Sequence, residues 1–161
     1  MELNTLLKEL KSLNIQHIHI PESEENPFPR IDFPIGSDKN NVERVVQCTI
    51  QAQELFDTKS QLYRLYYTFP FKVEALATAH MARLVSFLNT HQDFPGFSYD
   101  EVEGRIFFQY TQFGLEKGQY LVAILGLFAI TLSLFETPIQ EIAEGRQSMN
   151  EFLEEMINTN A

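Results

Sequence analysis

The spacing of apolar residues changes several times along the chain, and each spacing predicts a different element. Leucines recur every three or four residues over 2–13, which places one apolar stripe on a helix. Residues 16–20 alternate between apolar and polar, as in a short strand. Prolines and glutamates fill 21–29 and predict a loop. The stretch 31–35 is extended, but Pro34 has no N–H for a ladder, so we expect an edge strand there.

Longer alternating segments predict two hairpins. Residues 42–55 and 61–69 both have period two and are separated by a short polar turn. A second pair of alternating segments covers 97–113 and turns near Gly104. Strands that follow one another in hairpins predict a largely antiparallel sheet.

The helical period returns in the second half of the chain. It predicts a helix over 72–91 and an almost wholly apolar helix over 116–135. Thr137 can cap the first free amides of a further helix, and Pro138 suits its first position. We therefore expect a separate, acidic amphipathic helix within 137–161.

The apolar helix needs comparison with a membrane span. Its apolar run, 120–135, is shorter than the roughly 20 residues that usually cross a bilayer, and Glu116 and Glu136 flank it. We therefore expect a helix buried in a soluble fold. One side of this helix is mostly small, and its residues are Ala123, Gly126, Ile130 and Ser133. Such a side would let another backbone approach closely.

The order of these elements predicts the α+β class. The apolar face of each strand has to be covered by helices, so we expect two layers, a mostly antiparallel sheet and a covering layer of helices. A chain of 161 residues fits one domain, 1–161, with a core large enough to need no disulfide or metal.

Charge narrows the classes of partner. The formal net charge is −10, with only 12 Lys and Arg, and these are scattered singly. Nucleic acids and anionic membrane surfaces both need basic clusters, so we expect neither as a partner. Cys48 is the single cysteine, and the first residues do not resemble a signal peptide. We expect a cytoplasmic protein whose partners are other proteins or a second copy.

No motif in the sequence predicts catalysis. Neither a phosphate-binding glycine loop nor a nucleophile elbow occurs. His17 and His19 have a metal-ligand spacing, but zinc needs three or four protein ligands, so two solvent-facing histidines are the simpler interpretation. Cys48 lies on the apolar face of its strand, where burial suppresses reactivity. We expect no enzyme, cofactor or metal.

The polar face of the predicted sheet is the candidate site. It combines uncharged polar residues with aromatic ones, which suits a dimer or peptide contact. An ordinary solvated sheet face is the competing interpretation. The candidate residues are Thr49, Gln51, Arg64, Tyr66, Phe107 and Gln109.

A second hypothesis places a pocket between the sheet and the helices. His80 lies on the apolar stripe of the 72–91 helix, where a hydrogen-bonded core histidine is the simpler interpretation. A small-molecule binder or a cryptic enzyme would need that histidine together with Tyr63, Tyr67 or Tyr110. The first hypothesis remains a protein-binding module without catalytic activity.

The element order also resembles the type III secretion chaperone-like fold, and within it the YbjN-like proteins, a group of bacterial regulators. The resemblance covers roughly residues 1–135. It is carried by the 42–69 hairpin, the 72–91 helix, the 97–113 hairpin and the apolar 120–135 helix. It implies a small acidic cytoplasmic homodimer that holds another polypeptide without ATP or metal. The final helix from Thr137 departs from the simplest version of this pattern.

Overall fold

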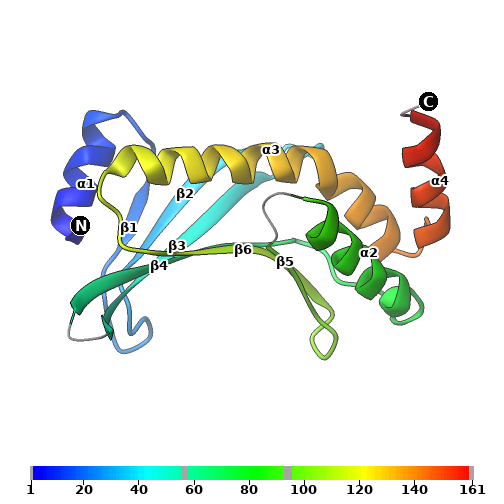
Figure 1. The fold of residues 1–161 in the computed structure, drawn as a ribbon, viewed down its shortest axis with the longest axis horizontal. Coiled ribbons are helices and arrows are strands. Elements are labelled where there is room, and N and C mark those ends of the chain that lie inside the picture. The colour runs from blue at the N-terminus through cyan, green and yellow to red at the C-terminus, as the bar shows by residue number, and fades with distance from the viewer. Residues whose placement is uncertain (1, 56–57, 93–95, 160–161) are drawn as a thin grey trace. The chain divides into compact units, whose positions relative to one another are not determined.

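A computed structural model describes residues 2–55, 58–92 and 96–159. The helices are α1 (Leu3–Ser12), α2 (Thr78–His91), α3 (Gly118–Ala143) and α4 (Met149–Thr159), with a 3-10 turn, η1 (Ala75–Ala77), before α2. The strands are β1 (Ile18–Ile20), β2 (Arg30–Ser37), β3 (Glu43–Leu55), β4 (Thr58–Thr68), β5 (Phe97–Asp100) and β6 (Arg105–Phe113). These strands form a six-stranded sheet in the order β1-β2-β3-β4-β6-β5 (Figure 1). The α+β prediction, with a mostly antiparallel sheet and helices, is confirmed.

The chain divides into two compact units. The first unit contains residues 1–67 and 109–130, and the second contains 68–108 and 131–161. The first unit therefore holds α1, β1 to β3, nearly all of β4 and the beginning of α3. The second holds α2, β5, the part of α3 beyond Ile130, and α4, and β6 is divided between the two units after Phe108.

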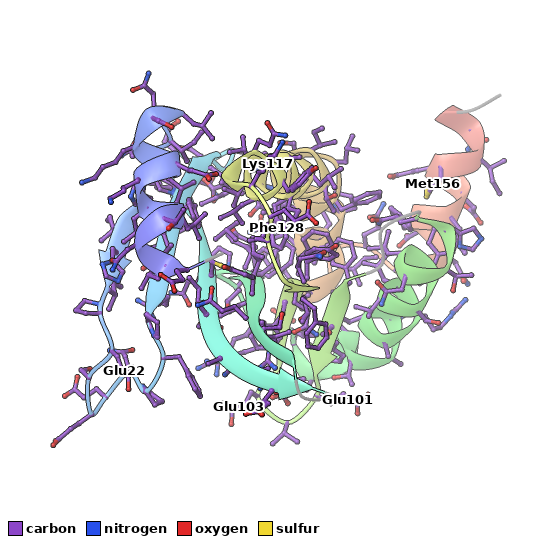
Figure 2. All side chains as sticks on the ribbon, turned by 60° about the vertical axis from the view of Figure 1, so that its left-hand side comes forward. Glu22, Glu101, Glu103, Lys117, Phe128 and Met156 are labelled. Carbon is purple, nitrogen blue, oxygen red and sulfur yellow. The ribbon has the colours of Figure 1, made fainter. Side chains whose placement is uncertain are left out.

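The core of the first unit follows the predicted alternation. Val46, Cys48 and Ile50 of β3 are buried, as are Tyr63 and Leu65 of β4. The leucine stripe of α1 contributes Leu6 and Leu10, and α3 contributes Leu121 and the fully buried Phe128 (Figure 2). Because alternate residues of β3 and β4 are buried, one face of this part of the sheet supplies the core.

The second unit is held together by an aromatic cluster and an asparagine. Phe97 of β5 packs on Phe108 with ring centroids 4.7 Å apart and meets Phe135 edge-on at 6.2 Å. Asn89 of α2 accepts the backbone N–H of Phe97 at 3.0 Å and donates to its carbonyl at 2.8 Å. One side chain therefore fastens the end of α2 to the start of β5.

The expectation of an edge strand over 31–35 is met at Pro34 but not at the start of β2, which lies between β1 and β3. β1 pairs only with residues 30–32 of β2, from Ile20 opposite Arg30 to Ile18 opposite Asp32. Pro34 lies beyond the end of β1. Its missing N–H therefore costs no ladder bond on that side, which is why β2 tolerates a proline.

The helix expected from residue 72 begins later, at Thr78. The backbone N–H of Val73 donates to Gly104 at 2.9 Å, and that of Glu74 donates to Ala143 at 2.8 Å. Glu74 has an extended backbone with a ψ of 148°, so helical geometry begins only after it. Leu76 consequently lies in η1 and is 93% exposed, although the helical stripe placed it in the core.

The helix break expected before Thr137 is also wrong. α3 continues through Pro138 to Ala143, and the break falls at 144–148, where Gly145 has a φ of 67°. A capping box starts α4: Ser148 N–H donates to Glu151 at 2.7 Å, and Glu151 N–H donates to the Ser148 hydroxyl at 3.3 Å. The sequence therefore offers two capping residues, Thr137 and Ser148, and only Ser148 begins a helix.

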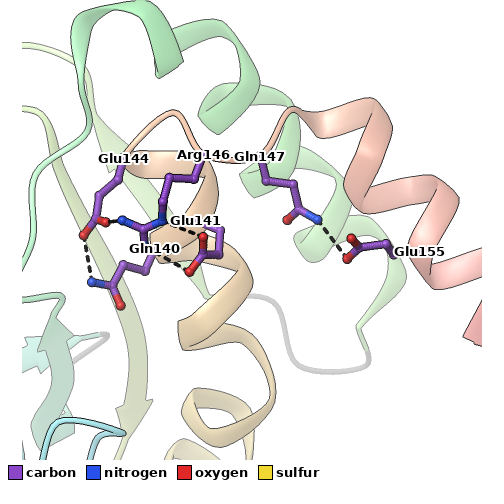
Figure 3. Close-up of polar contacts among 6 residues, drawn as sticks. All are labelled: Gln140, Glu141, Glu144, Arg146, Gln147 and Glu155. Carbon is purple, nitrogen blue, oxygen red and sulfur yellow. Dashed lines mark hydrogen bonds and ion pairs between the residues drawn. The ribbon is translucent and has the colours of Figure 1, made fainter.

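An arginine stabilises the end of α3 (Figure 3). Arg146 donates its Nε to one oxygen of Glu141 at 2.6 Å and its Nη2 to the other at 2.9 Å, and it also pairs with Glu144. Gln140 donates to Glu144 at 2.7 Å. Negative charge at a helix C-terminus opposes the helix dipole, and Arg146 offsets part of the charge of the two carboxylates there.

Candidate functional site

Most of the predicted sheet-face residues lie together in the first unit. Thr49 of β3 is opposite Arg64 of β4, and Gln51 is opposite Leu62, so these side chains share one face. Tyr66 lies on the same face, opposite Gln47. Arg64 is exposed, whereas Thr49, Gln51 and Tyr66 are half-buried.

The end of β6 continues this face. Gly114 N–H donates to the carbonyl of Gln61 at 2.8 Å, and counting back along the antiparallel strands places Gln109 beside Tyr66. Gln109 is exposed. Phe107 belongs to the second unit, where it is half-buried between the buried Ile106 and Phe108.

An ion pair on β2 also belongs to this face and was missed by sequence reasoning. Arg30 lies opposite Thr49, and Asp32 lies opposite Gln47. The Arg30 Nε is 2.8 Å from one Asp32 oxygen, and Nη2 donates to the other at 3.1 Å. Because the two charges cancel, the face keeps little net charge. Residues two apart on a strand point to the same face, so the spacing of Arg30 and Asp32 could have predicted this ion pair.

Part of α3 is an exposed apolar surface, which we call the α3 stripe. It consists of Ala123, Gly126, Leu127 and Ile130 of the first unit. Leu127 is 41% exposed and Ile130 is 60% exposed. Apart from the nearby backbone of α3 itself, no described atom lies within 4 Å of the position that a Cβ on Gly126 would occupy. The small side of this helix, which was expected to allow close approach, therefore faces outward among the described residues.

A cleft lies beside the α3 stripe within the first unit. Its volume is about 1090 Å³, and its walls come from α1, the end of β6 and the start of α3. The carboxylates of the cleft belong to Glu2, Glu9 and Glu116. Its aromatic walls are Tyr110, Phe113 and Tyr120. The lining residues come from two stretches that are far apart in sequence, 2–9 and 110–124, so no local sequence motif predicts the cleft.

Hydrogen bonds hold the walls of this cleft in place. Glu9 accepts the backbone N–H of Gly118 at 2.5 Å, which joins α1 to the start of α3. Tyr110 donates its hydroxyl to Gln112 at 2.9 Å, and Gln112 donates to the carbonyl of Phe113 at 3.0 Å. The cleft is therefore formed before any partner binds.

A smaller groove lies on the other side of the α3 stripe. It has a volume of about 320 Å³ and is mostly apolar. Phe33, Pro34 and Ile35 of β2 form one wall, and α3 forms the other with residues that include Gly126. The α3 stripe thus borders a hollow at each side.

The groups that the sequence offers for chemistry are buried or hydrogen-bonded in the structure. Cys48 is buried, and burial raises the pKa of its thiol to about 12, so its predicted lack of reactivity is supported. Burial, followed by the charge of Cys48, raises the pKa of Tyr63 to about 12. The Nδ1 of His80 accepts the N–H of Met149 at 3.3 Å. His80 does not line the cleft to which Tyr110 contributes.

The two histidines near the N-terminus lie apart from any cluster of ligands. His17 precedes β1 and has its Nδ1 2.8 Å from the carbonyl of Ile15, and His19 is exposed. Across residues 2–55, 58–92 and 96–159, no group of three or more histidine, cysteine or acidic side chains could hold a metal ion.

The length of α3 changes the comparison with a membrane span. Because the helix continues through Pro138, it has 26 residues and is long and apolar enough to cross a membrane, alone among the described helices. Core helices of soluble proteins share this property, and a third of its most apolar stretch is buried. The short length expected from the sequence therefore no longer separates the two interpretations.

A comparison of the chain with known protein families, with curated proteins and with solved structures found no match. The resemblance to secretion chaperones and YbjN-like proteins therefore stays a prediction from element order. The surfaces described above are the basis for any proposal about function.

Proposed function

We propose that the protein is a non-enzymatic binding module of the cytoplasm, chaperone-like or regulatory, that acts through contacts with other polypeptides and forms a homodimer. The observation that carries this proposal is the α3 stripe. Leu127 and Ile130 expose large apolar side chains side by side on a regular helix. Contiguous apolar surfaces of this kind are typical of protein interfaces.

The occupant we assign to the α3 stripe is a second copy of the chain. Two copies that each carry a net charge of −10 repel one another over most of their surfaces. From Gly118 to Phe135, α3 has no charged residue, so the repulsion is weakest there. The open space at Gly126 beside the bulk of Leu127 would let two helices pack ridge into groove.

The sheet face is the competing surface for dimerisation. It is half-buried at Thr49 and Tyr66, and its charges on Arg30 and Asp32 are already paired. It therefore offers less exposed apolar area than the α3 stripe. We keep it as the surface against which the proposal is tested.

Light scattering with size-exclusion chromatography on the purified chain tests the proposal. We expect a wild-type dimer, and we expect Leu127→Glu with Ile130→Glu to raise the dissociation constant by at least about tenfold while circular dichroism stays unchanged. The matched control, Thr49→Glu with Tyr66→Glu, adds the same charge to the sheet face and should leave the dimer intact. A monomeric wild type, or a dimer lost only in the control, would contradict the assignment.

A further inference from the structure

The cleft beside the α3 stripe has a chemistry different from that of the stripe. Glu2, Glu9 and Glu116 contribute three carboxylates to its lining, and none of the described residues that line it is a lysine, arginine or histidine. Lys8 and Lys117 each adjoin a lining glutamate in sequence, but both are exposed and neither is part of the lining. Figure 2 shows Lys117 just before the start of α3. The cleft therefore favours a positively charged occupant.

Aromatic rings make the cleft more selective than an acidic surface. Phe113 is 54% exposed and Tyr120 is 48% exposed, so each presents a ring to whatever enters. Cations that stack on such rings gain an additional attraction, and the planar guanidinium of arginine does so most often. The same guanidinium pairs with carboxylates through two hydrogen bonds.

The size of the cleft favours a polypeptide over a single ion. Its volume of about 1090 Å³ is at the upper end of the usual range for small-ligand pockets. The carboxylates do not gather into a set that could hold a metal ion among the described residues. Ala123 belongs to both the cleft and the α3 stripe, so a bound segment and a second copy of the chain would occupy adjacent surfaces.

We propose that this cleft binds a basic segment of a partner polypeptide, with an arginine side chain held between the carboxylates of Glu2 and Glu116 and the rings of Phe113 and Tyr120. The proposal rests on the protein-binding function and names the chemistry of the partner. The net charge of −10 would steer such a segment toward the protein.

Fluorescence polarisation with the full chain tests the proposal. The probe is a labelled peptide with four arginines spaced by Gly-Ser, and its match has citrulline, the neutral isostere, at each arginine. We expect binding of the arginine peptide only, and a loss of at least tenfold in affinity in a Glu2→Gln and Glu116→Gln double variant. Tyr120→Ala should cause a smaller loss of several-fold.

A matched variant separates the cleft from bulk charge. Glu22 and Glu24 are exposed in the loop after β1 and do not line the cleft, so Glu22→Gln with Glu24→Gln removes the same charge elsewhere. Figure 2 shows Glu22 in this loop. This control should retain wild-type affinity. An equal loss in the control, equal binding of the citrulline peptide, or no binding at all would overturn the proposal.

Two further measurements distinguish a peptide from a small polyamine, and distinguish peptide binding from dimerisation. Spermine should compete only weakly; competition at a concentration equal to that of the peptide would assign the cleft to a small polyamine and overturn the peptide assignment. The Glu2 and Glu116 variant should keep the wild-type oligomeric state, and the Leu127 and Ile130 variant should keep peptide binding. Failed peptide binding by an intact dimer thus rejects only the cleft, whereas peptide binding by a monomer rejects only the dimer.

Discussion

The carboxylate of Glu9 in α1 accepts the backbone N–H of Gly118, the first residue of α3, at 2.5 Å across 109 residues of sequence. The first N–H groups of a helix have no partner within the helix, and a carboxylate satisfies both that donor and the positive end of the helix dipole. One side chain therefore caps α3 and fixes α1 beside it.

Replacing Glu9 by alanine should lower the free energy of unfolding by about 1–2 kcal/mol, because the cap is lost. Glu9→Gln keeps an acceptor and should cost less. Urea denaturation measures both changes. Glu2→Gln is the control, since Glu2 makes no side-chain cap hydrogen bond to α1, and it should stay within about 0.5 kcal/mol of wild type. If Glu9→Ala is as stable as wild type, Glu9 does not stabilise the start of α3.

Two glycines of α3 should respond to alanine with opposite signs. At Gly118, a Cβ would lie 3.0 Å from the Glu9 carboxylate and 3.2 Å from the Glu9 Cβ. This crowding should displace the cap and cost about 1 kcal/mol. At Gly126 a Cβ meets open space, so alanine should stabilise the helix by about 0.5–1 kcal/mol. Thermal unfolding of the two variants checks the signs, and a common sign would contradict the placement of α3.

The position of the helix break can be tested by removing each capping signal. Ser148→Ala should cost about 1 kcal/mol, because the hydroxyl accepts the N–H of Glu151. Thr137→Ala replaces an exposed side chain in the interior of α3 and should change the free energy of unfolding by less than about 0.5 kcal/mol. Chemical denaturation measures the free energy of unfolding of both variants. A larger loss at Thr137 would move the break back to the site that the sequence predicts.

Alkaline pH should destabilise the protein through Cys48. Burial raises the pKa of its thiol from 9.0 to about 12, so the folded state keeps a proton that the unfolded state loses. The stability from this group is complete below pH 9 and falls by up to about 1.4 kcal/mol per pH unit as the pH rises toward 12. Tyr63 adds to the fall only above pH 10.

Urea unfolding at pH 8, 9 and 10 measures this slope. Cys48→Ala has a smaller side chain and will be less stable at every pH, but its slope between pH 9 and 10 should be flatter than that of wild type. A thiol reagent at pH 8 should modify the wild type only after unfolding. Rapid modification of the folded chain would show that Cys48 is accessible.

Local periodicity predicted those parts of the fold that local interactions decide. The alternation along β3 and β4 identified the buried residues, and the turn at Gly104 follows from a φ of 65° that suits glycine. The start of α2 could not be predicted in this way. The backbone before it is extended at Glu74, and Val73 and Glu74 donate to Gly104 and Ala143. A sequence window contains neither of these partners.

The sheet face was predictable from local alternation, whereas the cleft and the outward side of α3 were not. Thr49 and Arg64 were expected on one face because strand residues alternate, and their cross-strand pairing places them there. The cleft needs Glu9, Phe113 and Tyr120 together, and only tertiary structure brings them to one place. A single helical period also could not decide which side of α3 faces outward, since most of that helix is apolar all round.

Pro34 has a consequence for how copies of this chain can meet. The part of β2 that β1 leaves unpaired is a place where a strand from another molecule could add to the sheet. Pro34 offers no N–H there, and the register of β2 against β3 shifts between Pro34 and Ser37. We expect this edge to be a poor template for intermolecular β-pairing, which protects the protein against aggregation and leaves association to side-chain surfaces.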